Sequence, residues 1–366
     1  MKRVLVFLVL LAGGVGLSAW VGLADGRQDA LEQRAQLNTS KQRHGLNDGE
    51  ILVWAPDGGA PPPGVASPPT GAAQPRRSRA NNPQSGPQRY VAAQPGGSAL
   101  DSYSATRQLL PLAKPLPAPR KGDWRGQIQE PAQSFDTFLH EARRARGKLV
   151  ILPLGDMPGD QMRAIDHVAD AMSAFFGMQV VRAPALALER LPKTCFRNLS
   201  GGKRQLNAEA FMRLILRPSV GGDVASVVAV TALDIYPGEE WPFESAFGWS
   251  SFSGGTSVIS TSQVVSGRGA DRGKNLLRLS KLATHELAHT FGLKHCSTHD
   301  CLMNGCSSLR ENDSKPFHLC PDCLAKLSYA LSSDPAAHLE DMLALCQNKG
   351  FSGESKYYVK ALERIR

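Results

Sequence analysis

The chain has 366 residues and a formal net charge of +9, and its length would allow two or three domains. Excess positive charge can indicate nucleic-acid binding, but the basic residues are not interleaved with aromatic ones, which argues against that function. The patterning instead indicates one folded domain that follows a leader and a long linker.

Residues 1–24 have the pattern of a signal peptide or of a membrane anchor. Lys2 and Arg3 precede an uncharged apolar run over residues 4–24, which is about as long as a helix needs to cross a bilayer. The Gly-Leu-Ala ending of that run suits cleavage equally well. Because the basic end stays inside, both alternatives place the rest of the chain outside the cytoplasm. We expect an exported protein, either attached to the membrane through residues 4–24 or released as a secreted or periplasmic protein.

Residues 25–130 change character and are dominated by Gln, Ser, Gly, Ala and Pro. Such a composition cannot bury a core large enough to offset the conformational entropy lost on ordering. We expect a disordered linker whose proline-rich parts are extended and whose arginines at 76, 77 and 79 add positive charge. It would hold the domain off a membrane or reach through a wall layer, or act as a spacer without a binding role.

Residues 131–366 carry the periodic patterns of a single folded domain. We expect helices over 135–142, 162–176 and 207–216, strands over 148–154, 178–181 and 224–235, and further sheet over 246–265. A helix over 275–291 follows, and helices over 323–331, 335–348 and 354–366 close the chain, the last with a solvated basic face. The alternation of strands and helices predicts an α/β fold, a mixed, mostly parallel sheet packed with helices.

The helix expected over residues 275–291 leads into the sequence HELAHTFGLKH. His285 and His289 are four residues apart, so both imidazoles leave the same helical face at a separation that suits two ligands of one zinc ion. Gly292 allows the positive φ at which the chain leaves the helix, and His295 can then become the third ligand. Three protein ligands leave the fourth tetrahedral position for water, as in catalytic rather than structural zinc sites.

Glu286 is the candidate general base beside this site. It follows His285 directly, so it points off the row of ligands but stays beside the metal. There its carboxylate can take a proton from water and later give it to a leaving amine.

Four cysteines downstream of the third histidine have the spacing of a second metal site. Cys296, Cys301, Cys320 and Cys323 form a C-x4-C and C-x2-C arrangement, which is typical of closed structural zinc sites. Two disulfides are the alternative, because the leader implies an oxidising compartment. A zinc ion here would pin the loop that carries the third histidine.

The remaining cysteines and two histidines of this region have no comparable spacing. Cys195, Cys306 and Cys346 are interpreted as buried thiols. His299 and His318 lie within the cysteine loop and could replace a cysteine ligand, but we interpret both as surface or outer histidines.

The run HELAHTFGLKHCSTHDCLMN, followed after a gap by CPDC, resembles the signature of the archaemetzincins. That family belongs to the metzincin metallopeptidases and is distinguished by four cysteines downstream of the zinc helix. The resemblance is dense over residues 284–327, thins upstream to a metzincin-like pattern, and does not extend before residue 130.

The resemblance implies a role for each residue of the motif. It makes His285, His289 and His295 the ligands of a catalytic zinc ion and Glu286 the general base. It makes Met303 the methionine of the Met-turn, a tight turn beneath the metal whose thioether forms an apolar floor.

The resemblance also indicates how a substrate is held. In metzincin-like folds the strand before the zinc helix forms the upper edge of the cleft, and residues 247–259 are assigned that role, with a mobile hairpin as the alternative. An edge strand has free N–H and C=O groups, so an extended peptide can bind by strand addition. No tyrosine follows the Met-turn before Tyr329, so stabilisation of the oxyanion would rest mainly on zinc.

Together these features predict a monomeric zinc-dependent metallopeptidase that acts on peptide or protein substrates and holds two zinc ions. Endopeptidase and aminopeptidase activity both stay open, because nothing places Glu239, Glu240 or Glu244 in the cleft to bind a free amine. The alternatives are a non-catalytic zinc-binding surface module and a scaffold in which both zinc ions are structural. The intact Glu286 argues against a pure binding site, which has no use for a base.

The compartment and the cysteine site conflict in this sequence. Four thiolates suit reducing surroundings, whereas the leader implies oxidising ones. Either zinc loaded before oxidation protects the thiolates, or residues 1–24 are not an export leader.

Overall fold

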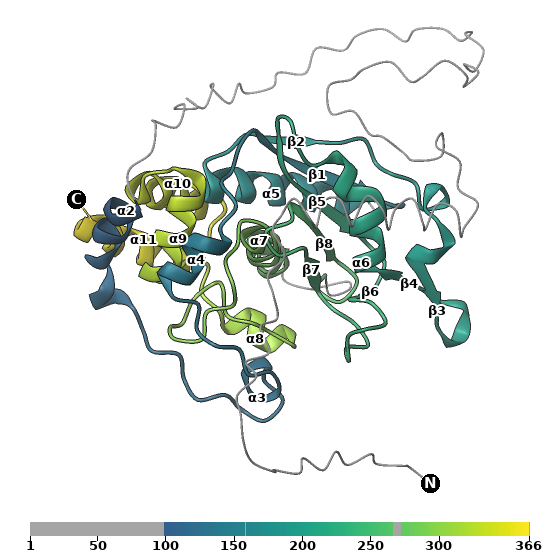
Figure 1. Ribbon diagram of the computed structural model, residues 1–366, viewed down its shortest axis with the longest axis horizontal. Coiled ribbons are helices and arrows are strands. Elements are labelled where there is room, and N and C mark those ends of the chain that lie inside the picture. The colour runs from purple at the N-terminus through teal and green to yellow at the C-terminus, as the bar shows by residue number, and fades with distance from the viewer. Residues whose placement is uncertain (1–98, 158, 266–271, 366) are drawn as a thin grey trace, which may run out of the picture. The chain divides into compact units, whose positions relative to one another are not determined.

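The computed structural model describes residues 99–157, 159–265 and 272–365 (Figure 1). The predicted leader over residues 1–24 and most of the predicted linker lie outside these residues. Within the described part of the chain, no helix combines the length and the apolar character that a membrane crossing requires.

The described chain begins with helices, continues through strands that alternate with helices and ends in helices (Figure 1). The helices are α2 Ala99–Arg107, α3 Trp124–Gln127, α4 Phe135–Glu141, α5 Gly159–Phe176, α6 Ala208–Phe211, α7 Arg272–His289, α8 Leu309–Ser314, α9 Pro321–Leu331, α10 Pro335–Asn348 and α11 Ser352–Ile365. The strands are β1 Lys148–Leu154, β2 Val180–Arg182, β3 Phe196–Asn198, β4 Arg204–Asn207, β5 Val224–Thr231, β6 Ile235–Tyr236, β7 Gly248–Ser250 and β8 Thr256–Ser260.

The main sheet has five strands in the order β2-β1-β5-β8-β7. Neighbouring strands are parallel except β7, which pairs antiparallel with β8 and forms one edge. All eight residues of β5 are buried, as expected for a parallel strand that is covered on both faces. The predicted mixed, mostly parallel sheet packed with helices is confirmed.

Alternate residues of the central strands enter two separate cores, because successive side chains of a strand point to opposite faces. Val228 and Val230 of β5 pack into the larger core, which also contains residues of α5, α7 and the C-terminal helices. Val227 and Ala229 enter a smaller core with Leu206 and Phe211. The larger core supports the helix that carries the zinc motif.

The strand expected over residues 224–235 is interrupted after Thr231. The Thr231 hydroxyl accepts a hydrogen bond from the backbone N–H of Leu233 at 3.2 Å, which turns the chain. The strand β6 then pairs with β4 in a second, three-stranded sheet of order β3-β4-β6. The apolar run over residues 224–235 therefore contributes one strand to each of two sheets. Its apolar composition continues past Thr231, so it did not predict the interruption there.

The helices α9, α10 and α11 gather on the side of the molecule where α2 and α4 lie (Figure 1). α5 contacts both α7 and α10, so it joins this group to the sheet. The last helix, α11, was expected to have a solvated basic face. It also has a buried face, formed by Tyr358, Ala361 and Leu362.

The predicted linker ends too late in the chain, because residues 99–130 pack against the folded domain. α2 contacts α9 and α10, and the Leu109 side chain is fully buried in the larger core. Leu116 donates a backbone hydrogen bond to Thr298 at 3.1 Å. The proline-rich composition averaged over the whole stretch concealed the few apolar residues that anchor its last third.

Truncation of Leu109 tests this correction. Leu109→Ala is expected to lower the free energy of unfolding by about 2–5 kcal/mol, because it leaves a cavity in the core. Leu110→Ala is the matched control: that side chain is 38% exposed, and its loss should change stability by less than about 0.5 kcal/mol. Urea unfolding of the full chain would give both free energies. Equal changes for the two variants would indicate that residues 99–130 are part of the linker, as the sequence predicted.

Candidate metal centre

The helix α7 presents His285, Glu286 and His289 in its last two turns. Thr290 and Gly292 end the helix, and Gly292 has a φ of 97°, as expected from the motif. A Cβ atom at Gly292 would lie 3.0 Å from the Cα of Ala142, and side chains rarely adopt this positive φ, so a substitution here would strain the turn.

The three histidines of the motif converge on one point. The Nε2 atoms of His285 and His289 are 3.1 Å apart. One ring nitrogen from each of His285, His289 and His295 lies within 4.8 Å of the other two. Three imidazole nitrogens at this separation fit a zinc ion, which binds histidine at about 2.0–2.1 Å.

The outer nitrogen of each ring has a hydrogen-bond partner. The Nδ1 atom of His285 is 2.9 Å from the carbonyl oxygen of Leu302, and that of His289 is 2.6 Å from the carbonyl oxygen of Leu293. Because a carbonyl only accepts, Nδ1 carries the proton in both rings and Nε2 keeps its lone pair for a metal.

Burial shifts the pKa values of the two helical histidines and of the candidate base. Burial lowers the pKa of His285 well below its usual value and that of His289 to about 3, so both rings are neutral at physiological pH. A metal-binding histidine has to be neutral. Burial also raises the pKa of Glu286, although a hydrogen bond from Ser250 opposes this shift.

The edge strand β7 passes directly over Glu286. The Ser250 hydroxyl lies within hydrogen-bond distance of two acceptors on Glu286, its carboxylate and, at 2.8 Å, its backbone carbonyl, and shares its one proton between them. A Cβ atom at Gly248 would lie 2.6 Å from the Cγ of Glu286, so only glycine permits this approach. The edge strand therefore comprises residues 248–250, a short part of the predicted range 247–259, and it also fixes the candidate base.

The loop that follows the helix returns beneath the histidines. Leu302, whose carbonyl accepts from His285, precedes the buried Met303. Cys296 donates a backbone hydrogen bond to Met303 at 2.8 Å, and the Asn304 side chain donates to the carbonyls of Cys296 and His299 at 2.8 and 2.9 Å. Asn304 therefore holds the ends of this loop together.

The four cysteines form a second cluster, in which Cys296, Cys301, Cys320 and Cys323 offer sulfur atoms within 4.8 Å of one another. The sulfur atoms of Cys296 and Cys320 are 3.8 Å apart, far beyond a disulfide bond, and all seven cysteines of the chain are free. The disulfide alternative is therefore not found.

The thiols of this cluster affect one another's ionisation. Burial raises the pKa of Cys301, and hydrogen bonds within the cluster raise that of Cys323 and lower that of Cys296. Four sulfur atoms this close could hold one metal ion as thiolates, because a cation between them would offset their mutual repulsion.

Among the described residues, the other cysteines and histidines considered from sequence belong to neither cluster, although the backbone carbonyl of His299 accepts from the Cys296 thiol at 3.7 Å. Cys195 and Cys346 are buried, and Cys306 is half-buried, 3.5 Å from the Nζ atom of Lys315. His318 stacks on Tyr357 with ring centroids 3.4 Å apart. The Nδ1 atom of His299 is 3.0 Å from the hydroxyl of Thr298.

Sequence reasoning did not identify three contacts of the centre. Glu130, placed at the end of the linker, touches His295, and Trp124 touches Glu130. Ser250 touches Glu286. A tryptophan in an otherwise polar, proline-rich stretch was the only local signal for the first pair, and Ser250 gave none.

The sequence is similar to known proteins over the part that forms this centre. The family model described as Peptidase family M54 matches residues 219–329. Archaemetzincin-2 of Macaca fascicularis is 26% identical over 262 residues, which cover 60% of this chain and 71% of that protein. Archaemetzincin of Pyrococcus abyssi (strain GE5 / Orsay) is 27% identical over 189 residues, which cover 51% of this chain and 97% of that protein.

Solved structures are also similar to this chain. An archaemetzincin from Methanopyrus kandleri has 26% sequence identity and a TM-score of 0.42, over 50% of this chain and 95% of that one. An archaemetzincin from Archaeoglobus fulgidus, complexed with malonate, has 26% identity and a TM-score of 0.40, over 49% and 99%.

Gly292 tests how the third histidine reaches the centre. Gly292→Ala forces a side chain into positive φ against the backbone of α4, so it should lower the free energy of unfolding by more than about 1 kcal/mol. Gly353→Ala in α11 is the control, since a Cβ atom there meets nothing within 4 Å. Urea unfolding compares the two, and a neutral Gly292→Ala would contradict this account.

Proposed function

We propose a mechanism for this chain, which belongs to the archaemetzincin family, peptidase family M54, and is a zinc metallopeptidase. The observation that carries the mechanism is the convergence of three histidine nitrogens beside one buried carboxylate. His285, His289 and His295 would hold the catalytic zinc ion, and Glu286 would act as the general base.

The zinc ion and the protein divide the chemistry between them. When bound, zinc supplies Lewis-acid chemistry, which acidifies water and polarises a substrate carbonyl. The protein keeps His285 and His289 neutral by burial and fixes their orientation through the carbonyls of Leu302 and Leu293. The centre is thereby arranged before any substrate arrives, which is what efficient catalysis requires.

Glu286 would move the protons of the reaction. Its carboxylate accepts the proton of the attacking water and then donates it to the nitrogen of the leaving amine. The Ser250 hydroxyl holds one carboxylate oxygen, which limits the rotation of the side chain. Because Ser250 belongs to the edge strand, the base and the strand that would bind the peptide are fixed relative to each other.

The substrate would lie extended along β7. This strand pairs with β8 on one side and forms the edge of the main sheet on the other, so it can add a peptide strand. Tyr329 does not contribute a donor here, because its ring packs against Phe135, Phe138 and Arg144. We therefore propose that carbonyl stabilisation comes from the metal rather than from a tyrosine.

Two zinc ions per chain are proposed, the second held by the four cysteines. Cys296 directly follows His295, so a metal at the cysteines would fix the backbone that presents the third histidine. The role is structural, because four protein ligands leave no open position for a substrate.

An exported location stays a proposal. It rests on the basic and apolar pattern of residues 1–24, which lie outside the described residues. Zinc bound before export would keep the four thiols reduced in an oxidising compartment.

Substitution of Glu286 tests the base. Glu286→Gln should retain both zinc ions and lose about 10²- to 10⁴-fold in peptide turnover, because it cannot accept a proton. Cleavage of a mixed peptide library by the full chain, read by mass spectrometry, measures the loss, and the product ends separate endopeptidase from aminopeptidase activity. The exposed Glu363→Gln is the control.

Two outcomes would contradict this assignment. Equal cleavage by Glu286→Gln and the unchanged chain would remove Glu286 as the base. A zinc-loaded unchanged chain that cleaves nothing would favour the non-catalytic zinc-binding module.

Substitution of Cys323 tests the second metal. Elemental analysis of the full chain should give two zinc ions, and Cys323→Ser should give one or none, with a lower melting temperature, because binding energy at structural sites contributes to folding. Cys346→Ser is the control, since that thiol is buried outside the cluster. Unchanged zinc content in Cys323→Ser would exclude a metal at the four cysteines.

A further inference from the structure

The third histidine differs from the other two in its outer partner. His285 and His289 use backbone carbonyls, whereas the Nδ1 atom of His295 is 2.9 and 2.8 Å from the two carboxylate oxygens of Glu130. These side chains are separated by 165 positions in the sequence. A carboxylate contact is charge-assisted and therefore stronger than a carbonyl contact.

Trp124 fixes the carboxylate of Glu130. Its indole Nε1 donates to Glu130 at 2.9 Å, and its ring meets His295 edge-on with centroids 5.2 Å apart. On its other side the ring stacks on Phe243 at 5.5 Å. A Cβ atom at Gly305 would lie 2.3 Å from the indole, so the backbone after the Met-turn is pressed against it.

Residues 114–133, which we name the N-terminal strap, run alongside the loop that carries His295. At one end, Asp300 donates a backbone hydrogen bond to Lys114 at 2.9 Å. At the other end, the Gln133 side chain donates to the carbonyl of Gly292 at 2.9 Å and accepts from the backbone of Lys294 at 3.2 Å. The strap therefore borders the loop along its length.

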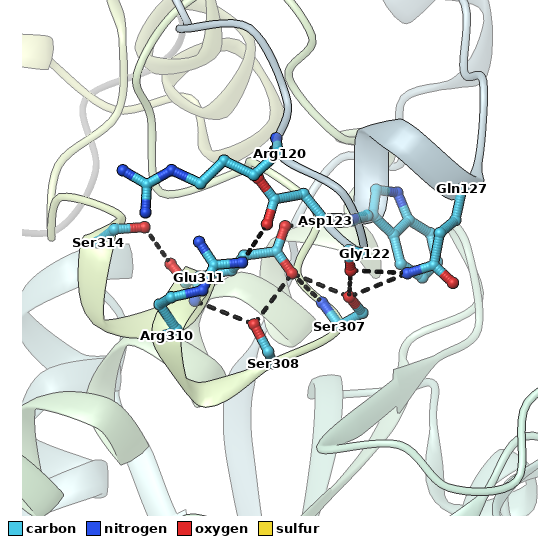
Figure 2. Close-up of polar contacts among 10 residues, drawn as sticks. Arg120, Gly122, Asp123, Gln127, Ser307, Ser308, Arg310, Glu311 and Ser314 are labelled. Atoms are coloured by element: carbon cyan, nitrogen blue, oxygen red, sulfur yellow. Dashed lines mark hydrogen bonds and ion pairs between the residues drawn. The ribbon is translucent and has the colours of Figure 1, made fainter.

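Polar contacts hold the middle of the strap against α8, as Figure 2 shows. Asp123 pairs with Arg310, and the backbone N–H of Trp124 donates to Glu311 at 2.9 Å. The Ser307 hydroxyl donates to the carbonyl of Gly122 at 3.1 Å. These contacts leave the indole little freedom to move away from Glu130.

We propose that Glu130 is a positioning residue for the third zinc ligand, held in place by Trp124 and the N-terminal strap, an inference that rests on the proposed function. Glu130 accepts a hydrogen bond from the Nδ1–H group of His295, which leaves Nε2 free for the metal and sets the plane of the ring. The residue lies outside the matched family region, 219–329, so the metal centre extends into the stretch that the sequence assigned to the linker.

A positioning role for Glu130 is measured by the zinc affinity of the three histidines. Removal of an outer partner of a metal-bound histidine typically costs about 10- to 100-fold in metal affinity. Glu130→Gln keeps the size of the side chain and loses its charge, so it should weaken zinc at the histidines by about 10- to 100-fold. Competition of the full chain against a chromophoric chelator measures this affinity, and a mercurial that releases zinc from thiolates counts the cysteine site separately.

Two further variants separate positioning from a general structural effect. Asp166→Asn removes an exposed carboxylate that pairs with Arg182, away from the strap and the histidines, so the zinc affinity should stay unchanged. Trp124→Phe keeps an aromatic ring but loses the hydrogen bond to Glu130, so it should weaken zinc less than Glu130→Gln does. Melting temperatures at saturating zinc show whether each variant is folded.

The outcomes distinguish this inference from the proposed function. If the unchanged chain binds zinc at both clusters and Glu130→Gln binds it equally well, the positioning role is overturned while the proposed function stands. Equal losses in Glu130→Gln and Asp166→Asn would also overturn it, because they would indicate a general loosening. An unchanged chain that binds zinc only through thiolates would overturn both.

Discussion

The metal centre depends on one constraint: each of its three imidazoles needs an acceptor for its outer proton before its inner nitrogen can serve a metal. For His285 and His289 the acceptors are the backbone carbonyls of Leu302 and Leu293, which exist in the right place only if the chain turns back beneath the helix. For His295 the acceptor is Glu130, from a distant segment. The loop after α7 is therefore constrained at Leu293, His295 and Leu302.

The four-cysteine cluster and the histidine centre stabilise the same loop from two sides. Cys296 is adjacent to His295 and donates its backbone N–H to Met303, so a metal at the thiols fixes the third ligand and the turn together. The side-chain NH2 group of Asn304 donates to the backbone carbonyls of Cys296 and His299. Its side-chain oxygen, Oδ1, accepts from the backbone N–H of Cys301. A loop without regular secondary structure thus becomes rigid enough to carry a ligand, which a precise site requires.

The predictable part of the centre is the part that local spacing encodes. The spacing of His285 and His289 on one helix, and the glycine that ends it, follow from helical geometry, and the ligand atoms do converge. The contacts of Glu130 and Ser250 span 165 and 36 positions, and no helical or strand periodicity reports on pairs so far apart. The break after Thr231 was missed for a related reason, since it depends on which sheet the chain joins rather than on its apolar character.

The N-terminal strap and the metal act on the same residues, and this has a thermodynamic consequence. The strap contacts the loop from Gly292 to Glu311 at both ends, and ligation by His295 would restrict part of the same loop. Each event would therefore leave less conformational entropy for the other to remove, so the two should favour each other by equal amounts. Zinc at the histidines should strengthen the contact between Glu130 and the His295 ring. In turn, the strap in its observed position should increase the affinity of the histidines for the metal. A stretch with the composition of a linker can in this way become part of a metal centre.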